Sequence, residues 1–327
     1  MSALRGIALA LATVWSAAAL SHAAGAEPLR IFYFTYVGDG PLFVAQEKGF
    51  FAKEGIEVSL IRSDDHTAMF AALAAGQVDA VAGSLQDIVL FAEPNEHPLQ
   101  CVLAIMDSRG TDGIVANDDI RSIADLKGKT VAFPFNSSLQ FYLNFLLQEV
   151  GLSEADLGEV VDLWGDEAAE AFLLREVDAA VTWEPDLTPA SNAGHGHLLT
   201  DTSERPGLIV DCVVTTAEIL HDRQAEFQAL GRAWDAAVDY TRAHPDEANA
   251  IIARYLGGSL EDPAVVGESL RGIHLYDGEE NRAYFGTRDH PGQIYETMQR
   301  IIDVWSSLGR LKAAIAPADA ISHDVWE

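Results

Sequence analysis

Short runs of β-branched and aromatic residues alternate with segments of helical periodicity along the first third of the chain. The alternation predicts strands followed by helices, the pattern of βαβ units that build a parallel sheet. The expected strands are residues 29–36, 57–62, 80–83 and 99–106, and the expected helices are residues 42–54, 67–75 and 86–91.

A second set of the same kind follows the turn at residues 107–112. Its expected strands are 130–133, 160–163 and 179–183, and its expected helices are 123–126, 138–150 and 167–174. Both sets pass from a helix to a strand through a polar turn followed by Val-Asp-Ala, once at Val78 and once at Val177. Two similar units in tandem would leave a cleft between them.

The chain then returns through an expected strand at 208–214 and becomes mainly helical, at 224–244, 245–255 and 293–308. We therefore predict an α/β fold of two lobes. Residues 27–110 and 208–327 are assigned to lobe 1 and residues 111–207 to lobe 2, with a ligand cleft between the lobes.

The start of the chain has the features of a secretory signal peptide. Arg5 precedes an apolar run at residues 6–20, and small residues follow up to Ala26. This order of a positive end, an apolar core and small residues is typical of a segment removed on export. With residues 1–26 assigned to it, and no cysteine near the cleavage point, a periplasmic protein without a lipid anchor is expected.

Charge excludes several classes of partner. The sequence holds 50 acidic and 21 basic residues, a formal net charge of -29, whereas binding to phosphate backbones needs a basic surface. Nucleic acid is therefore not expected as a partner. Cys101 and Cys212 lie in apolar segments and could either pair or remain buried thiols.

Catalytic signatures are missing from the sequence. It has no nucleophile elbow, zinc-protease helix or P-loop, and Gly38-Asp39-Gly40 lacks the third glycine of a dinucleotide fingerprint. His195-Gly196-His197 and Asp64-Asp65-His66 could be imagined as metal ligands, but a surface loop and a solvated turn are the better interpretations. No enzyme activity, cofactor or metal is expected.

Candidate binding residues lie where predicted strands end, because ligands bind beyond the carboxyl ends of parallel strands. Asn136, Ser137 and Ser138 mark one such exit, where Ser137 and Gln140 have the spacing of a capping box and free N–H groups could hold an oxygen. The other exits supply Gln86 with Asp87, and Trp183 with Glu184. Asp64, after the second strand, completes this set.

Five segments together resemble one family of proteins. They are residues 41–51, 72–80, 123–132, 177–185 and 305–309, and they occur in the order found in the nitrate/sulfonate/taurine/pyrimidine family of substrate-binding proteins of ABC importers. The resemblance covers nearly all of the chain after residue 26. It implies a type II periplasmic-binding-protein fold that closes on a small-molecule ligand like a hinged clamp. It also implies delivery to the membrane permease of an ABC importer, with a monomer as the simplest state.

Within that family the chain looks most similar to the taurine binders. There the turn matching residues 136–139 takes the sulfonate, and acids matching Asp112 and Asp211 take the amino group. Two departures matter: Asp87 and Glu184 replace uncharged residues, and Gln86 and Leu139 replace small hydroxyl residues. An anion would thus meet up to four carboxylates and no evident pocket arginine, unless Arg109 turns inward.

The expected ligand is therefore a small amine, guanidinium or amide-like compound. The acids would bind its nitrogen, and Tyr36, Trp164 and Trp183 would form aromatic walls. Taurine or another aliphatic sulfonate is one alternative. Binding or synthesis of a thiamin-precursor pyrimidine is another, but the synthase of this fold relies on a histidine cluster around pyridoxal phosphate. In this sequence only His66 lies near a predicted strand exit, with no lysine beside it.

Overall fold

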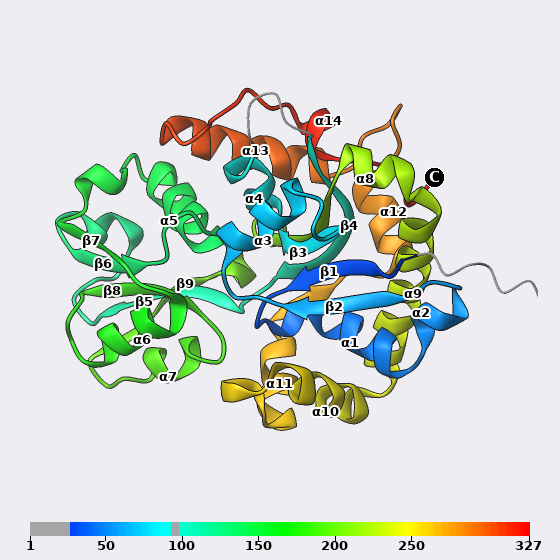
Figure 1. Ribbon diagram of the computed structural model, residues 1–327. Coiled ribbons are helices and arrows are strands. Elements are labelled where there is room, and N and C mark those ends of the chain that lie inside the picture. The colour runs from blue at the N-terminus through cyan, green and yellow to red at the C-terminus, as the bar shows by residue number, and fades with distance from the viewer. Residues whose placement is uncertain (1–26, 93–97) are drawn as a thin grey trace, which may run out of the picture.

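The computed structural model describes residues 27–92 and 98–327, so the expected signal peptide lies outside the described residues. Two separate sheets form the centres of two lobes (Figure 1). In lobe 1 the strand order is β11-β4-β10-β3-β1-β2, and in lobe 2 it is β7-β6-β8-β5-β9. The strands of lobe 1 are β1 (Leu29–Tyr33), β2 (Val58–Arg62), β3 (Ala80–Ser84), β4 (Leu99–Ser108), β10 (Val210–Thr216) and β11 (Ile273–Leu275). Those of lobe 2 are β5 (Asp112–Asn117), β6 (Thr130–Phe133), β7 (Glu159–Asp162), β8 (Ala179–Trp183) and β9 (Gly196–Asp201).

Helices cover both faces of each sheet (Figure 1). Those before lobe 2 are α1 (Gly40–Glu47), α2 (Phe50–Lys53), α3 (His66–Ala74) and α4 (Leu85–Leu90), and lobe 2 contains α5 (Ser138–Glu149), α6 (Gly165–Leu173) and α7 (Leu187–Ser191). After lobe 2 come α8 (Ala217–Asp222), α9 (Gln224–Ala243), α10 (Pro245–Leu256), α11 (Pro263–Leu270), α12 (Gly278–Phe285), α13 (Ile294–Ser307) and α14 (Pro317–Ala320). Short 3-10 turns occur at Val37–Asp39, Ile123–Leu126, Glu154–Asp156, Thr202–Glu204 and Gly258–Leu260. Each strand lies within the residue range assigned to its lobe from the sequence. The lobe boundaries themselves stay a prediction.

Both sheets are mixed, so the parallel pairing expected from the βαβ pattern holds for only part of each sheet. β1 pairs in parallel with β2 and β3, but β10 runs antiparallel to β3 and β4. In lobe 2, β5 likewise runs antiparallel to β8 and β9. β5 and β10 each enter a lobe directly from the other one, and β11 also runs antiparallel to β4. Antiparallel pairs need no helical crossover.

The expected single helix at 42–54 is two helices, because the backbone turns at Gly49. Gly49 has φ +70, a left-handed conformation that costs glycine little and other residues more. α1 ends at Glu47 and α2 begins at Phe50.

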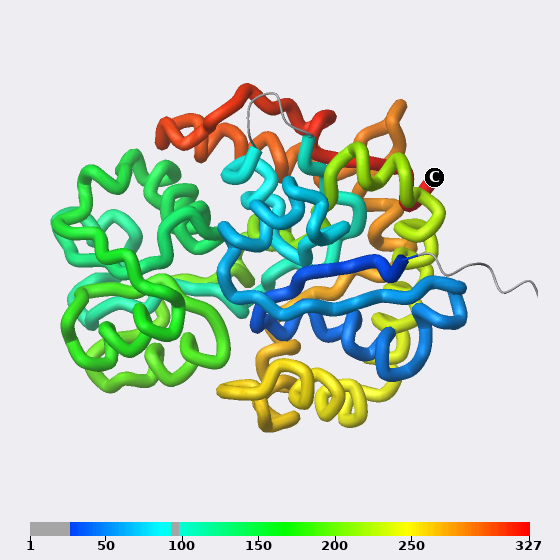
Figure 2. Tube along the Cα trace, viewed as in Figure 1, coloured from blue at the N-terminus to red at the C-terminus, as the bar shows by residue number. Residues whose placement is uncertain are grey.

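Buried side chains tie the two lobes together as well as filling each of them. Trp234 and Trp305 are the largest fully buried ones. One continuous core cluster contains Phe70 of lobe 1 and Phe133 of lobe 2. Helix α13 packs on α4 and also contacts α5, and Figures 1 and 2 show it extending over the top of the molecule toward lobe 2.

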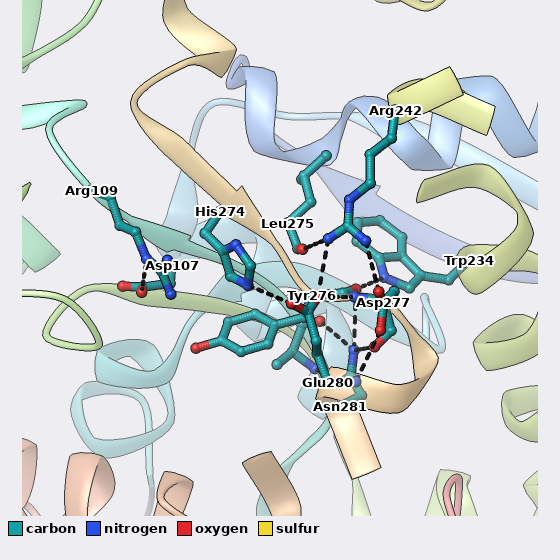
Figure 3. A network of polar contacts seen from close by, with 11 residues as sticks. Asp107, Arg109, Trp234, Arg242, His274, Leu275, Tyr276, Asp277, Glu280 and Asn281 are labelled. Carbon is teal, nitrogen blue, oxygen red and sulfur yellow. Dashed lines mark hydrogen bonds and ion pairs between the residues drawn. The ribbon is translucent and has the colours of Figure 1, made fainter. Parts of the chain in front are cut away.

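The chain crosses between lobes twice, after β4 and before β10, and the two crossings are bonded to each other. The Ser108 N–H donates to the Ile209 carbonyl at 3.0 Å. The Asp107 carboxylate accepts the Gly207 N–H at 2.7 Å and the Arg109 Nε–H at 2.8 Å. Figure 3 shows the contact between Arg109 and Asp107 at one end of a polar network on lobe 1. Arg109 is thus engaged by Asp107 instead of turning inward, and it is not among the residues that line the pocket between the lobes.

Two further expectations concern cysteines and membranes. Cys101 and Cys212 are buried free thiols on the neighbouring strands β4 and β10. Among residues 27–92 and 98–327, no helix combines the length and apolar character needed to cross a bilayer.

Candidate ligand-binding site

A pocket lies between the lobes, and we call it the inner pocket. It has about 510 Å³ of empty space, part of which is open to solvent. Its walls are Phe34, Tyr36, His66, Ser84, Asp87, Met106, Ile209 and Asp211 from lobe 1, and Asp112, Ser137, Ser138, Trp164 and Trp183 from lobe 2. Neither lysine nor arginine is among these lining residues.

Strand pairing places the acids of the inner pocket. Asp211 lies on β10 between Ser84 of β3 and Met106 of β4. Asp112 begins β5 opposite Trp183, the last residue of β8. Both acids therefore stand where a crossing segment meets a sheet, one in each lobe.

Asp87 comes from the first turn of α4 rather than from a strand. Its carboxylate accepts the Ser84 N–H at 2.8 Å, which caps the helix. The same Oδ2 lies 3.7 Å from the His66 Nδ1. Burial lowers the pKa of His66, but the carboxylates of Asp87, Asp39 and Asp64 together leave that pKa raised.

Five aromatic rings form a continuous arc around the inner pocket. Phe34 stacks on Tyr36 at 5.6 Å between centroids, with 6° between the ring planes. The arc continues with edge contacts from Phe34 to His66 at 5.0 Å, His66 to Trp164 at 6.0 Å, and Trp164 to Trp183 at 5.2 Å. Electron-rich ring faces beside carboxylates attract cations.

Several polar atoms of the inner pocket have no hydrogen-bond partner among the described residues. They are the Tyr36 hydroxyl, His66 Nε2 and Asp112 Oδ2. Buried polar atoms are costly to leave unpaired. A ligand that donates to Asp112 would satisfy one of them.

Burial raises the pKa of three carboxyl groups in and near the inner pocket. Burial raises the pKa of Asp112 to about 6, and the Ser108 hydroxyl opposes part of that rise. Burial, followed by the charges of Asp39 and Asp112, raises the pKa of Asp211 well above its ordinary value. Burial also raises the pKa of Asp39, a fully buried residue that lines neither the inner pocket nor the outer chamber, to about 8. A cationic ligand would reverse these shifts by stabilising the ionised forms.

A second, larger cavity adjoins the inner pocket, and we call it the outer chamber. It has about 1440 Å³ of empty space including open solvent, and His66, Ser137 and Trp164 line both cavities. Its other lining residues are Asp64, Asp65, Thr67, Leu90, Phe91, Phe135, Asn136, Gly309, Arg310 and Lys312.

The structure brings most of the sequence-predicted site residues to these two cavities. The inner pocket contains Tyr36, Asp87, Asp112, Ser137, Ser138, Trp164, Trp183 and Asp211. The outer chamber contains Asp64 and Asn136. Gln86 and Glu184 line neither cavity, and their part in ligand binding stays a prediction.

Gln86 and Glu184 were expected to line the cleft, and the local contacts of each side chain explain why neither does. Gln86 is fully buried in α4, with its amide atoms unpartnered within the described residues. Glu184 turns back onto the start of α7, where Oε1 accepts the Thr188 hydroxyl at 2.5 Å. A pattern of strand exits cannot distinguish a side chain that faces the cleft from one that serves the next helix.

The expected capping box at α5 forms only in part. Ser137 Oγ accepts the Gln140 N–H at 3.2 Å, but Gln140 Oε1 accepts the Asn136 N–H at 2.7 Å instead of reaching back to Ser137. Asn136 has φ +52, and this tight turn leads into the hydroxyls of Ser137 and Ser138 at the pocket.

Sequence reasoning missed Phe34, His66, Ser84, Met106 and Ile209 as lining residues. Asp64-Asp65-His66 was interpreted as a solvated turn, which is wrong for His66 because it lines both cavities. For the apolar residues Phe34, Met106 and Ile209, the sequence pattern does not distinguish a pocket wall from the hydrophobic core. Ser84 directly precedes the predicted Gln86-Asp87 exit, so its place could have been inferred.

The imagined metal sites do not form in the described residues. His195 contacts the carbonyl oxygens of Ala193 and Phe172, each at 3.1 Å, and Gly196 and His197 begin β9. Across residues 27–92 and 98–327, no group of three or more His, Cys, Asp or Glu side chains could hold a metal ion.

Comparisons with known proteins agree with this architecture. A protein of Brucella abortus (strain 2308), provisionally named as a binding protein, is 24% identical over 306 residues, covering 91% of each chain. The taurine-binding periplasmic protein of Escherichia coli (strain K12) is 28% identical over 166 residues, covering 50% of each chain. The periplasmic aliphatic sulphonate binding protein SsuA from Escherichia coli shares the fold with a TM-score of 0.74 and 19% identity, covering 91% of this chain and 92% of that one.

The two mixed sheets, the paired crossings and the pocket between lobes define the class of the molecule as a periplasmic-binding-protein fold. A model described as "NMT1/THI5 like" matches residues 39–248. The chain belongs to the NMT1/THI5-like family. The fold and family expected from the five sequence segments are thereby confirmed.

Proposed function

We propose that the protein captures a small nitrogen-containing cation or strong N–H donor in the periplasm and delivers it to an ABC importer. The observation that supports this most directly is the lining of the inner pocket. It combines Asp87, Asp112 and Asp211 with an aromatic arc, and it has no lysine or arginine among its described lining residues. Carboxylates buried without a partner are unfavourable, and a cationic guest would supply the partner.

The polarity of the pocket also limits the ligand. Met106, Ile209 and the rings favour an organic compound with some apolar surface, while Asp112 and Asp211 need hydrogens to accept. Guanidinium, amidinium, primary amine and amide-like groups offer both. A quaternary ammonium would satisfy the rings but would leave the Asp112 oxygen unpaired.

Taurine or another aliphatic sulfonate is the second candidate. Ser137 and Ser138 line the inner pocket at the start of α5, and helix N-termini favour anions. The Ser137 hydroxyl itself donates to the Pro134 carbonyl at 2.6 Å. Taurine also carries an ammonium group that could donate hydrogen bonds to Asp112 or Asp211. A sulfonate without an amine would face the acids with nothing to offset them.

Binding rather than catalysis is proposed because the relatives named as binding proteins share this chain's family or fold. His66, the histidine of the pocket, is engaged by Asp87. No lysine lines the inner pocket to form an imine with pyridoxal phosphate, which disfavours the synthase chemistry. The purified protein is expected to leave its ligand unchanged.

A calorimetric screen tests the proposal with guanidines, amines, amides, aminopyrimidines, taurine and simple sulfonates. We expect N–H-donor cations to bind one per chain, and Asp211→Asn to weaken them at least tenfold. Asp222→Asn is the matched control, since it removes one exposed acid that lines neither cavity. Tight binding of simple sulfonates, with none of the nitrogen compounds bound, would overturn the proposal.

A further inference from the structure

The inner pocket and the outer chamber differ in their charged side chains. The inner pocket is lined by Asp87, Asp112 and Asp211 with no lysine or arginine, whereas the outer chamber is lined by Arg310 and Lys312 as well as Asp64 and Asp65. His66 lines both cavities, with its Nδ1 facing Asp87. Among the described lining residues of the two cavities, lysine and arginine therefore occur only in the outer chamber.

The two acids of the outer chamber already serve the local fold. Asp64 Oδ1 accepts the Thr35 N–H at 2.9 Å and the Thr35 hydroxyl at 2.8 Å, and its other oxygen lies 3.3 Å from Arg62. Asp65 caps α3 by accepting the Ala68 N–H at 2.9 Å. Both carboxylates have partners of their own, which reduces their effect on a guest.

Arg310 is in the opposite situation. A guanidinium carries five N–H donors, and the one hydrogen bond of the Arg310 side chain to a described residue is a long contact of 3.4 Å from Nη1 to Asn136 Oδ1. The sequence has 50 acidic and 21 basic residues, so basic side chains are scarce. Arg310, with N–H donors unused by the described residues, nevertheless lines the chamber next to the acidic inner pocket. Its fork geometry suits a carboxylate or a phosphate.

We infer that the ligand is dipolar and extends through both cavities, with its nitrogen head at Asp112 and Asp211 and an anionic tail in the outer chamber against Arg310. This inference rests on the proposed function, because it assumes that the head is bound in the inner pocket. It adds the chemistry of the other end of the ligand. His66, Ser137 and Trp164 would surround the linker between the two ends, since they line both cavities.

Three guanidines that differ only at the tail test the inference. They are 4-guanidinobutyrate with a carboxylate tail, agmatine with an ammonium tail, and n-butylguanidine with an uncharged tail. We expect calorimetry to find 4-guanidinobutyrate bound at least tenfold more tightly than agmatine. We expect n-butylguanidine to lie between them, and the spread to shrink with added salt.

The Arg310→Gln variant should reduce the advantage of 4-guanidinobutyrate over n-butylguanidine to less than threefold while leaving n-butylguanidine unchanged. Arg310→Lys should retain part of it. Arg300→Gln is the matched control, because Arg300 is an exposed arginine on α13 that lines neither cavity. Arg310 is itself exposed, so an unchanged melting temperature is expected and would show that the fold is intact.

The outcomes separate the two claims. If all three guanidines bind with equal affinity, or if Arg310→Gln preserves the advantage of the carboxylate tail, the dipolar ligand is wrong and the nitrogen-binding pocket stands. If none of the three binds, the inference is wrong for guanidines, and the calorimetric screen with amines, amides and aminopyrimidines decides whether the proposed head recognition fails as well.

Discussion

The rings of His66 and Trp164 meet edge to face across the cleft, with 6.0 Å between their centroids. His66 begins α3 in lobe 1, and Trp164 precedes α6 in lobe 2. Because each ring belongs to a different lobe, their contact reports how closely the lobes approach. The pair also marks the junction of the inner pocket and the outer chamber.

Replacing Trp164 by alanine should weaken binding of a cationic ligand about two- to fivefold. A cation over an exposed aromatic ring contributes about 0.5–1 kcal/mol, and Trp164 is 40% exposed, so the folded state should also lose little stability. Calorimetry measures the affinity, and thermal melting checks the fold. Trp164→Phe keeps a ring at the junction and should retain most of the affinity; equal affinities for all three proteins would contradict a role for this ring.

Affinity for a cationic ligand should rise with pH across the range around 6. Asp112 has a pKa of about 6 in the empty protein because it is buried, and a cation favours its ionised form. Binding must therefore release protons, and it weakens as the pH falls and Asp112 becomes protonated. Calorimetry in two buffers of different ionisation enthalpy measures this release.

The Asp112→Asn variant provides the matching control for that pH dependence. It should bind more weakly at pH 8 and lose the proton release that belongs to this carboxyl group. An anionic ligand would behave in the opposite way, since its binding would strengthen as the acids become protonated. Affinity that falls with rising pH would therefore argue against a cationic guest.

Asp39 should make the empty protein less stable at alkaline pH. Its carboxyl group is fully buried, neither oxygen has a hydrogen-bond partner among the described residues, and burial raises its pKa to about 8 from an ordinary value of 3.8. The folded state thus holds a proton that the unfolded state has lost between these values. The stabilisation is complete below about pH 4 and is lost as the pH rises through 8.

Asp39→Asn should accordingly melt at a higher temperature than the parent protein at pH 9, with the difference shrinking toward pH 4. Asp222→Asn, which removes an exposed acid, should show no such trend. Melting curves recorded from pH 4 to pH 9 measure both. A lower melting temperature for Asp39→Asn at pH 9 would mean that the ionised form has a stabilising partner.

The sequence predicted elements whose signal is local. β6 and β8 begin and end as expected, and α5 differs from its prediction by one residue, because hydrophobic periodicity and caps are properties of neighbouring residues. β5, β9 and β11 were missed. β5 and β9 form the antiparallel side of lobe 2, and their pairing depends on segments that lie about 80 residues apart.

The contrast between local signals and contacts of distant segments also explains which site residues were predicted and which were missed. Asp87, Ser137 and Trp183 were found because a strand exit can be recognised from the residues around it. His66 and Met106 were missed, since the inner pocket selects them by the position of one lobe against the other. Glu184 satisfied the local pattern, yet its side chain is bonded to Thr188, a choice that only the folded helix α7 reveals.

Asn281 should be a large contributor to stability although it lies away from both cavities. It is fully buried, its Oδ1 accepts the Ala104 N–H at 2.8 Å, and its Nδ2 donates to the carbonyl oxygens of Ala104 and Asp277 at 3.0 Å each. Figure 3 shows the side chain within the network that joins β11 and α12 to Trp234.

Asn281→Ala would leave both polar groups of Ala104 buried without these partners. Each such loss costs about 1–3 kcal/mol, so urea unfolding should show a decrease of about 2–5 kcal/mol in the free energy of unfolding. Ligand affinity of the folded variant should be unchanged, because Asn281 lines neither cavity. Gln299→Ala, an exposed amide on α13, serves as the control, and a loss for Asn281→Ala no larger than that of this control would show that β4 does not depend on the bonds from α12.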